Sequence, residues 1–289
     1  MSYILTFVAS DPEAHPLTPV HFPSGDVTWL SPNKAADVAI GAAPGHEALE
    51  DIRDALEMEE IDIFLSPAEN RRKRLLLADM DSTIVTGETL DELADFAGLK
   101  DKIAAITQRA MNGELNFHDA IRERVGLLKD LSEGALHKTL ARTKLSPGAK
   151  TLVATMKKHG SHCVLVSGGF TFFTEAIAGQ AGFDAHHGNT LEIKGSALTG
   201  RVIEPILDKH AKVEFLKQHL SALDLQPQDA MTIGDGANDL PMLKTAGLGI
   251  GYHPKPNVAK ELVNMILYGD LTAALYAQGY SDDMICFED

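Results

Sequence analysis

The chain has 289 residues, too many for one ordinary hydrophobic core and enough for two domains of about 150 residues. Hydrophobic residues make up 44% of it and charged residues 23%, which is typical of globular rather than disordered proteins. Its 26 Lys and Arg residues against 41 Asp and Glu residues give a net charge of −15. This balance argues against a nucleic-acid partner, because phosphate backbones are bound by surplus positive charge. An anionic substrate would need a locally cationic site.

The two cysteines, Cys163 and Cys286, offer neither a disulfide framework nor the spacing of a metal site. A reducing cytoplasm is the simplest compartment for such a chain. The first residues carry no basic segment of the kind that opens a secretion signal. No apolar run approaches the roughly 20 residues of a membrane helix. We therefore expect a soluble, cytoplasmic protein with no membrane partner.

Residues 1–71 predict a small α/β domain. Tyr3–Ala9 is typical of a strand, and a stretch punctuated by prolines follows it. His46–Met58 has apolar residues at helical spacing, and Ile61–Leu65 predicts another strand. We find no catalytic constellation in this domain.

A basic cluster, Arg71-Arg72-Lys73-Arg74, marks the end of this domain. Such a cluster is typical either of a localisation or nucleic-acid patch, or of a solvated linker that precedes a buried strand. In a chain with a net charge of −15 we favour the solvated linker.

Beyond the cluster, short apolar runs alternate with amphipathic helical patterns. The runs are Leu75–Ala78, Cys163–Val166, Ala230–Ile233 and Leu248–Tyr252, and the helices include Gly148–Lys158 and Ala211–Ala222. Apolar strands that alternate with helices indicate a parallel sheet covered on both faces, as in Rossmann-like α/β folds. Ligands bind such sheets beyond the carboxyl ends of the strands, where this sequence places its acidic and glycine-rich segments.

Residues 87–145, between the first two of these strands, show no strand pattern. Four helices are expected there: Thr89–Ala97, Asp101–Met111, Phe117–Leu128 and Ser132–Arg142. A crossover of this length exceeds what one helix needs. We predict that the insert forms a helical cap over the strand ends, and that residues 72–86 and 146–289 form the core domain.

Asp79 and Asp81 stand where the first apolar strand ends. Residues i and i+2 of an extended backbone point to the same side, so one carboxylate can act as nucleophile and metal ligand and the other as proton donor. The same spacing is common at turns, where aspartates cap helices. A calcium loop starting at Asp79 is excluded, because Ile84 and Leu90 stand where glycine and glutamate are needed.

The segment 234–239 reads Gly-Asp-Gly-Ala-Asn-Asp and follows another apolar strand. Glycines beside an acid let the backbone approach a ligand closely. Asp235 could complete a site for Mg²⁺ with Asp79, since Mg²⁺ prefers oxygen ligands. The alternative is a Gly-Asp turn with Asn238 and Asp239 capping a helix.

Ser167 and Gly168 close the second core strand. A hydroxyl and free backbone N–H groups at the start of a helix can bind an anion, although a tight strand-to-helix turn has the same sequence pattern. Lys212 is a lone lysine on a predicted helix, and such a lysine usually faces solvent. Its significance depends on the other motifs.

The order Asp-x-Asp, Ser-Gly, Lys, Gly-Asp-Gly-x-x-Asp is far more specific than any of its parts, and it resembles the four motifs of the haloacid dehalogenase (HAD) superfamily of aspartate-nucleophile phosphatases. From Leu75 onward the chain resembles the phosphoserine phosphatase family of that superfamily. The segments that carry this resemblance are Asp79–Val85 with Glu88, Met111–Phe117, Arg122–Val125, Val166–Phe170 and Gly234–Asp239. Bacterial members often carry a small N-terminal domain that can be similar to a ligand-sensing ACT module, which residues 1–71 would supply here.

The resemblance implies the HAD fold and Mg²⁺-dependent hydrolysis of O-phospho-L-serine to L-serine and phosphate, the last step of serine biosynthesis. Asp79 would be the nucleophile that forms an aspartyl-phosphate, and Asp81 the general acid and base. The Asp79 carboxylate, the Asp81 main-chain carbonyl and the Asp235 carboxylate would hold Mg²⁺, with Asp239 in support. The residues implied to hold the phosphoryl oxygens are Ser167, Gly168, Lys212 and Asn238.

The cap would select the substrate. The resemblance implies that Glu88 binds the ammonium of phosphoserine and Arg124 its carboxylate, with Met111 and Phe117 as apolar walls. From the residues alone, each of the four has an ordinary structural reading, as a first-turn helix acid, a surface arginine or part of the cap core.

Two other functions fit parts of the pattern. A phosphotransferase on the same scaffold would pass the phosphoryl group to another alcohol such as homoserine, and it would share the first half of the reaction. A non-catalytic amino-acid sensor would keep the scaffold without its chemistry, which the intact Asp79, Asp81, Lys212 and Asp235 argue against. A homodimer is compatible with the resemblance.

Overall fold

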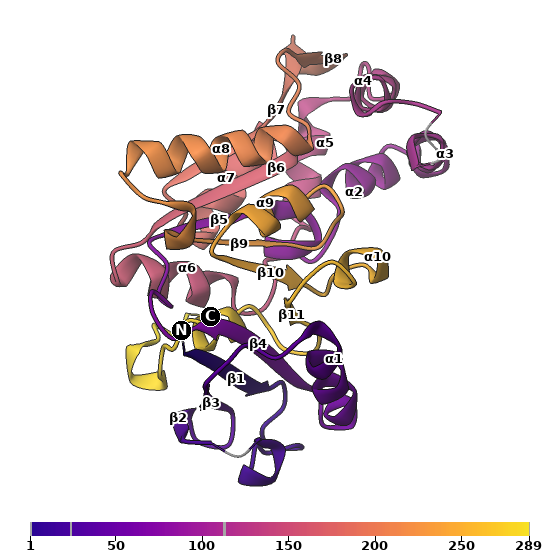
Figure 1. The fold of residues 1–289 in the computed structure, drawn as a ribbon. Coiled ribbons are helices and arrows are strands. Elements are labelled where there is room, and N and C mark those ends of the chain that lie inside the picture. Colours follow the sequence, from indigo (N-terminus) through magenta and orange to yellow (C-terminus); the bar gives the residue numbers. More distant parts are fainter. Residues whose placement is uncertain (1, 24, 112–113, 289) are drawn as a thin grey trace.

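The computed structural model describes residues 2–23, 25–111 and 114–288, except for the side chains of residues 110, 111 and 209. Within these residues the strands form two sheets, one above the other in Figure 1. The smaller sheet has the strand order β2-β3-β1-β4, and the larger has the order β11-β10-β9-β5-β6-β7-β8. None of the described helices is both long and apolar enough to span a membrane.

The smaller sheet is antiparallel and uses the first part of the chain. Its elements are β1 (Tyr3–Ala9), β2 (Val27–Ser31), β3 (Ala35–Ile40), α1 (His46–Ala55) and β4 (Ile61–Pro67), with 3-10 turns at Pro19–His21 and Glu57–Glu59. Phe7, Val38 and Ile63 pack with Leu49 of α1 into a separate hydrophobic core. The predicted helix and two strands are present. The sequence does not predict β2 and β3, because a proline-rich stretch precedes them and β3 is rich in alanine, which favours strands weakly.

The larger sheet is parallel at all neighbouring pairs but one. Its strands are β5 (Leu75–Ala78), β6 (His162–Phe170), β7 (Ala185–Lys194), β8 (Ala197–Ile203), β9 (Ala230–Gly234), β10 (Leu248–Tyr252) and β11 (Asn264–Ile266). Only β7 and β8 pair antiparallel among these described strands. The predicted fold class, α/β with a parallel central sheet, is confirmed.

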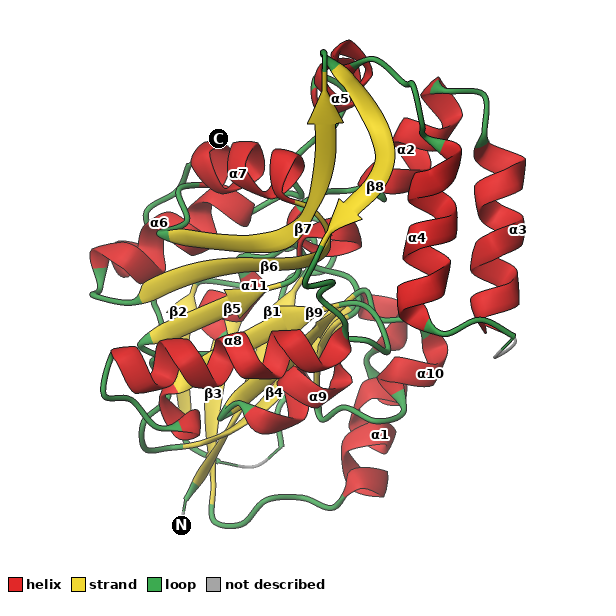
Figure 2. Cartoon of the chain, turned by 90° about the horizontal axis from the view of Figure 1, so that it is seen from above, coloured by secondary structure: helices red, strands yellow, loops and turns green. Residues whose placement is uncertain are grey.

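Helices cover both faces of this sheet (Figure 2). They are α6 (Ala149–Lys158), α7 (Thr171–Ala181), α8 (Lys209–Ala222), α9 (Leu240–Thr245), α10 (Pro256–Ala259) and α11 (Ala273–Tyr276), followed by a 3-10 turn at Asp282–Met284. Leu75 and Leu77 pack with α8 and α9, whereas Leu76 packs on the other face with α6 and α7. The alternation of side chains along β5 therefore requires apolar residues at every position, which explains its unbroken apolar run.

The insert between β5 and β6 forms the cap, at the upper right of Figure 1. Its four helices are α2 (Thr89–Phe96), α3 (Lys100–Met111), α4 (Phe117–Leu127) and α5 (Glu133–Leu140), as predicted apart from their ends. The two connections of the cap to the sheet lie side by side. Val85 pairs with Leu145 in an isolated antiparallel bridge, and the Thr86 N–H donates to the Lys144 carbonyl (3.0 Å). The two chain connections thus form one short paired ribbon, and a second isolated bridge, between Ser132 and Ala197, joins the cap to β8.

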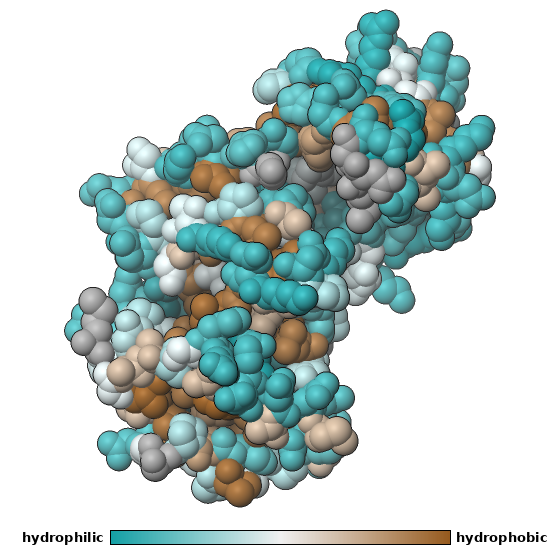
Figure 3. All heavy atoms as spheres, turned by 45° about the vertical axis from the view of Figure 1, so that its right-hand side comes forward, coloured by the Kyte–Doolittle hydropathy of each residue, from teal (hydrophilic) through white to brown (hydrophobic). Residues whose placement is uncertain are grey.

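The face that includes the cap side is mainly hydrophilic, as Figure 3 shows. Hydrophobic residues gather in the lower half of that view, at the height of the smaller sheet in Figure 1. Val20, Trp29 and Met58 of the N-terminal segment are among the exposed large apolar side chains.

The segment between the two sheets is not the solvated linker predicted from its charge. Arg71 is largely buried and donates hydrogen bonds to both carboxylate oxygens of Asp37 on β3. Lys73 is buried too, and its ammonium donates to the Gln228 carbonyl at 2.8 Å. The prediction was wrong because a carboxylate and main-chain carbonyls satisfy these charges inside the protein. The other two members of the cluster are exposed.

A second contact joins the edge strands β4 and β11. The side-chain amide of Asn264 accepts from the Leu65 N–H (2.7 Å) and donates to the Leu65 carbonyl (3.1 Å), as a neighbouring strand would. Asp62, which is buried, accepts hydrogen bonds from the N–H groups of residues 267–269 at 2.7, 3.2 and 2.9 Å. Burial raises the pKa of Asp62 to about 6, against these hydrogen bonds.

Candidate active site

The carboxyl end of β5 carries the two aspartates of the first motif. Because β5 lies between β6 and β9 and is parallel to both, the ends of the three strands meet at one edge of the sheet. The Asp79 N–H still donates to the Ile233 carbonyl of β9 (2.9 Å). The chain then turns through Ser82, whose φ is 55°, and enters the cap. This course places Asp79 and Asp81 between the sheet and the cap.

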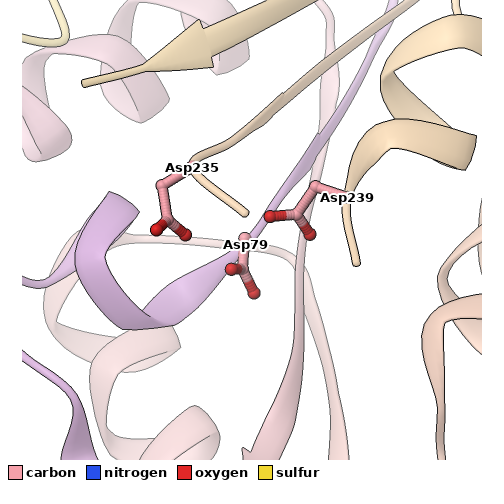
Figure 4. A group of neighbouring side chains, drawn as sticks. All are labelled: Asp79, Asp235 and Asp239. Carbon is pink, nitrogen blue, oxygen red and sulfur yellow. The ribbon is translucent and has the colours of Figure 1, made fainter. Parts of the chain in front are cut away.

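Three carboxylates from two strand ends converge there (Figure 4). Asp79, Asp235 and Asp239 are all buried, and each offers an oxygen within 4.8 Å of the others. The buried ammonium of Lys212, on α8, lies 2.6 Å from Oδ1 of Asp79 and 2.5 Å from Oδ1 of Asp239. Oδ2 of Asp239 accepts the Gly236 N–H (3.0 Å). Both oxygens of Asp239 are therefore already engaged by the protein.

The electrostatics of this cluster follow from its burial. Burial raises the pKa of Asp79 well above its ordinary value; the nearby Asp239 adds to the rise, and Lys212 opposes it. Burial also works against the charge on Lys212, but Asp239 and Asp79 outweigh it and raise the pKa of the lysine. Three buried carboxylates against one buried ammonium leave an excess of negative charge, which favours a bound cation.

Asp81 is held in place from two sides. Its Oδ1 accepts the Thr89 N–H at the start of α2 (2.7 Å), and its Oδ2 accepts the Ser167 hydroxyl (3.0 Å). Burial raises the pKa of Asp81 despite these hydrogen bonds. A Cβ at Gly169 would lie 3.0 Å from both Oδ2 of Asp81 and Oγ of Ser167, so this close approach favours glycine.

The cap contributes one acid, one base and an aromatic ring. Oε1 of Glu88 accepts the Ser82 hydroxyl (2.8 Å), and burial followed by repulsion from Asp81 raises the pKa of Glu88. Burial lowers the pKa of Arg124, which lies on α4 and donates from Nε to a carbonyl of its own helix. Phe117, at the start of α4, faces Gly168.

One cavity of about 220 Å³ connects these groups. Its lining residues are Asp79, Asp81, Glu88, Thr89, Leu90, Phe117, Ile121, Arg124, Ser167, Gly168, Gly169, Phe170, Asp235, Asn238 and Lys255. The polar lining holds carboxylates at the sheet end, with an arginine and a glutamate on the cap side. This arrangement can bind a small molecule that carries both signs of charge beside a cluster of buried carboxylates.

Comparison with known proteins places the chain in a family. The model of the haloacid dehalogenase-like hydrolases matches residues 76–244, more than half of the chain. The chain is 38% identical over 237 residues to the phosphoserine phosphatase of Archaeoglobus fulgidus, which covers 81% of this chain and 67% of that protein. It is 41% identical over 208 residues to the phosphoserine phosphatase of Polaromonas sp.. This match covers 70% of this chain and 88% of that protein. The chain belongs to the phosphoserine phosphatase family of these hydrolases.

The fold agrees with a solved structure of this family. The crystal structure of a probable phosphoserine phosphatase from Vibrio cholerae, in its unliganded form, has a TM-score of 0.79 and 30% identity. The match covers 98% of this chain and 88% of that one. Because nearly the whole chain is matched, the small N-terminal sheet belongs to the fold that the two chains share.

The structure brings most of the predicted site residues together around one cavity. The predicted residues that line it are Asp79, Asp81, Glu88, Phe117, Arg124, Ser167, Gly168, Asp235 and Asn238. Lys212 and Asp239 lie against Asp79 and are not among the lining residues. The predicted contact of Lys212 with the phosphoryl group stays a prediction. The side chain of Met111 lies outside the described residues.

Lys255 is a cavity residue that the sequence does not reveal. Its ammonium lies 3.0 Å from Oδ2 of Asp235. It stands between Pro254 and Pro256, in no motif that we recognise, yet it follows the carboxyl end of β10. Its position after a predicted strand of the same sheet was the available signal.

Proposed function

We propose that the chain hydrolyses O-phospho-L-serine to L-serine and phosphate, with Asp79 as the nucleophile. The observation that carries this proposal is the pairing of two groups in one small cavity. A buried carboxylate cluster comes from the strand ends, and Glu88 and Arg124 come from the cap. A phosphoserine carries a phosphate, an ammonium and a carboxylate, and the cavity holds a complement for each.

The donor set at the sheet end fits a hard divalent cation. All candidate ligand atoms are oxygens, and the cluster has more carboxylates than ammonium groups. We propose that Asp79, Asp235 and the main-chain carbonyl of Asp81 would hold Mg²⁺. Asp239 would support them, since Lys212 and Gly236 already engage its two oxygens. Bound Mg²⁺ would offset the repulsion between a carboxylate nucleophile and an anionic phosphoryl group.

Asp79 and Asp81 have different roles in the proposed reaction: Asp79 forms the bond to phosphorus, and Asp81 transfers the protons. Lys212 holds Oδ1 of Asp79, which orients the carboxylate and favours its ionised form. The carboxylate attacks phosphorus, the bond from phosphorus to the serine oxygen breaks, and Asp81 gives that oxygen its proton. The raised pKa of Asp81 supports this acid role. Asp81 then takes a proton from the water that attacks the aspartyl-phosphate, which releases phosphate and restores Asp79.

The second strand end supplies donors for the phosphoryl oxygens. Ser167, the Gly168 N–H and Asn238 line the cavity next to Asp79, where charge builds up in the transition state. Lys212 would add a positive charge from behind the nucleophile. We propose that Glu88 binds the substrate ammonium, and that the planar guanidinium of Arg124 binds its carboxylate.

Phosphate release from a panel of phosphomonoesters tests the activity. We expect a strong preference for phosphoserine over aryl and sugar phosphates, and loss of turnover when divalent cations are chelated. Equal rates across the panel would contradict the substrate assignment. The phosphotransferase alternative predicts that added homoserine lowers phosphate release and gains the phosphoryl group; the names of the relatives do not favour it.

We also propose a metabolic role and a compartment for the reaction, and a division of the chain into domains. A product L-serine puts the activity at the end of serine biosynthesis, and two unpaired cysteines are compatible with a cytoplasmic setting. We propose three units: residues 1–71, the cap at 87–145, and a core made of 72–86 and 146–289. Two separate sheets support this division. The homodimer stays a prediction.

A further inference from the structure

The backbone of Lys255 is held by hydrogen bonds, whereas its side chain is mostly exposed to solvent. Its N–H donates to the main-chain carbonyl of Asp235 (3.2 Å), and its own carbonyl accepts the N–H groups of Val258 and Ala259 of α10. Its side chain is 61% exposed, although the ammonium reaches Oδ2 of Asp235. The residue is thus anchored beside Asp235 with an ammonium that has room to move.

The two lysines of the carboxylate cluster differ in this respect. Lys212 is buried between Asp79 and Asp239 and is held by both. Lys255 has one carboxylate partner and lines the substrate cavity, as Lys212 does not. A second cavity of about 380 Å³, lined by hydroxyl-bearing residues such as Thr86 and Tyr252, also borders Asp235 and Lys255. Open space therefore lies on two sides of this ammonium.

We infer that Lys255 is a positioning residue with two alternating partners. It neutralises Asp235 while no cation is bound there, and once a cation engages Asp235 its ammonium turns to the anionic phosphoryl group in the cavity. This inference rests on the proposed function, because it assigns a role at the same site. The exchange keeps Asp235 from repelling substrate, and it makes cation binding and phosphate binding dependent on each other.

If Lys255 alternates between these partners, removing its charge should strengthen Mg²⁺ binding and weaken phosphate binding. Lys255→Met keeps an unbranched side chain of similar size but removes the ammonium, which competes with the cation for Asp235. We expect the variant to bind Mg²⁺ about three- to tenfold more tightly, and, with Mg²⁺ saturating, to bind inorganic phosphate about tenfold more weakly. Isothermal titration calorimetry on the full chain measures both affinities without any turnover.

Two further variants control the experiment. Lys244→Met removes an exposed lysine that pairs with Glu261 at 2.7 Å, away from the lining residues of the cavity, and should leave both affinities unchanged. Lys255→Arg keeps the charge and should restore both affinities toward those of the unsubstituted protein. A simple structural role of Lys255 would lower the melting temperature and weaken both ligands together.

The outcomes are separable from those of the proposed function. An Mg²⁺ affinity that stays the same or falls in Lys255→Met would overturn the inference, and so would an unchanged phosphate affinity. Failure of the unsubstituted protein to hydrolyse phosphoserine would instead contradict the proposed substrate. That result leaves the two binding measurements interpretable, since they use only Mg²⁺ and inorganic phosphate.

Discussion

The ammonium of Lys212 lies 2.6 Å from Oδ1 of Asp79, although the two residues are 133 positions apart in the sequence. Burial alone would favour a neutral Asp79, which could not attack phosphorus. Lys212 opposes that effect, so it would favour the ionised carboxylate that the proposed attack on phosphorus needs. Lys212 would therefore act on Asp79 even before any phosphate is bound.

Lys212→Met should therefore nearly abolish turnover. We expect kcat for phosphoserine to fall by about three orders of magnitude, because the variant loses the buried positive charge beside Asp79, the proposed nucleophile. Steady-state kinetics measure the loss, and circular dichroism checks that the variant is folded. Lys217→Met, which removes an exposed lysine of the same helix, is the control. A folded Lys212→Met variant with kcat within tenfold of the unsubstituted protein would contradict the role.

Asp81→Asn should separate the two halves of the reaction. The variant can neither protonate a poor leaving group nor activate water, so phosphoserine turnover should stop. With an aryl phosphate, whose leaving group needs no proton, we expect a burst of phenol equal to the enzyme concentration and then near-arrest. Rapid-mixing absorbance records the burst. Asp101→Asn, at an exposed acid of α3, should turn over steadily, and steady turnover by Asp81→Asn as well would exclude its role as base.

The pH dependence of the first step follows from the raised pKa of Asp81. A carboxyl group with a raised pKa stays protonated to higher pH than an ordinary one and loses its acid form as the pH rises through that value. We expect kcat/KM for phosphoserine to decline on the alkaline side, and to decline less for an aryl phosphate that needs no proton donor. Parallel pH profiles for the two substrates would count against Asp81 as the acid.

Arg124→Ala should impair recognition of the substrate carboxylate. We expect the KM for phosphoserine to rise by about tenfold to a hundredfold, in line with the loss of a charge-assisted hydrogen-bond pair, while aryl phosphate hydrolysis changes little. Arg122→Ala, two positions earlier on α4 and paired with Glu204 at the surface, is the matched control. An equal loss for both substrates in Arg124→Ala would mean that Arg124 supports the cap and does not read the substrate.

Asp62 predicts a pH dependence of stability that is independent of catalysis. Its pKa in the folded protein, about 6, lies above the ordinary value of 3.8, so folding favours the protonated form. The stabilisation is complete below the ordinary value and is lost as the pH rises through about 6, by up to roughly 3 kcal/mol. Urea unfolding between pH 4 and 8 measures it. Asp62→Asn should flatten this part of the curve, whereas Asp54→Asn, at an exposed acid of α1, should not.

In the larger sheet, the sequence predicted the strands that form buried apolar runs and missed those that are partly buried or very short. The run Leu75–Ala78 is apolar throughout because helices cover it on two sides, and it was recognisable for that reason. β7 begins with Ala185, His186 and His187 and is only partly buried, so it has no apolar run to detect. β11 is three residues long, too short for any periodicity.

The same distinction applies to the site. Asp79 and Asp235 stand in motifs at strand ends, so their convergence followed from a parallel sheet. Neither the burial of Lys212 behind Asp79 nor the approach of Lys255 to Asp235 could be read from the chain, because both depend on how a helix and a loop pack in three dimensions. Arg71 was predicted in a solvated linker because its partner, Asp37, lies on a strand that the sequence did not predict.

The side chain of Asn264 has a consequence for how the protein behaves among other proteins. β4 and β11 are the edge strands of two different sheets, and an uncovered edge is a template for pairing with another chain. The side-chain amide of Asn264 forms the two hydrogen bonds with the Leu65 backbone that a neighbouring strand would form. It therefore helps to cover the edges of both sheets. The small N-terminal sheet thus covers the β11 edge of the larger sheet, and we expect a core without that sheet to associate through the uncovered edge.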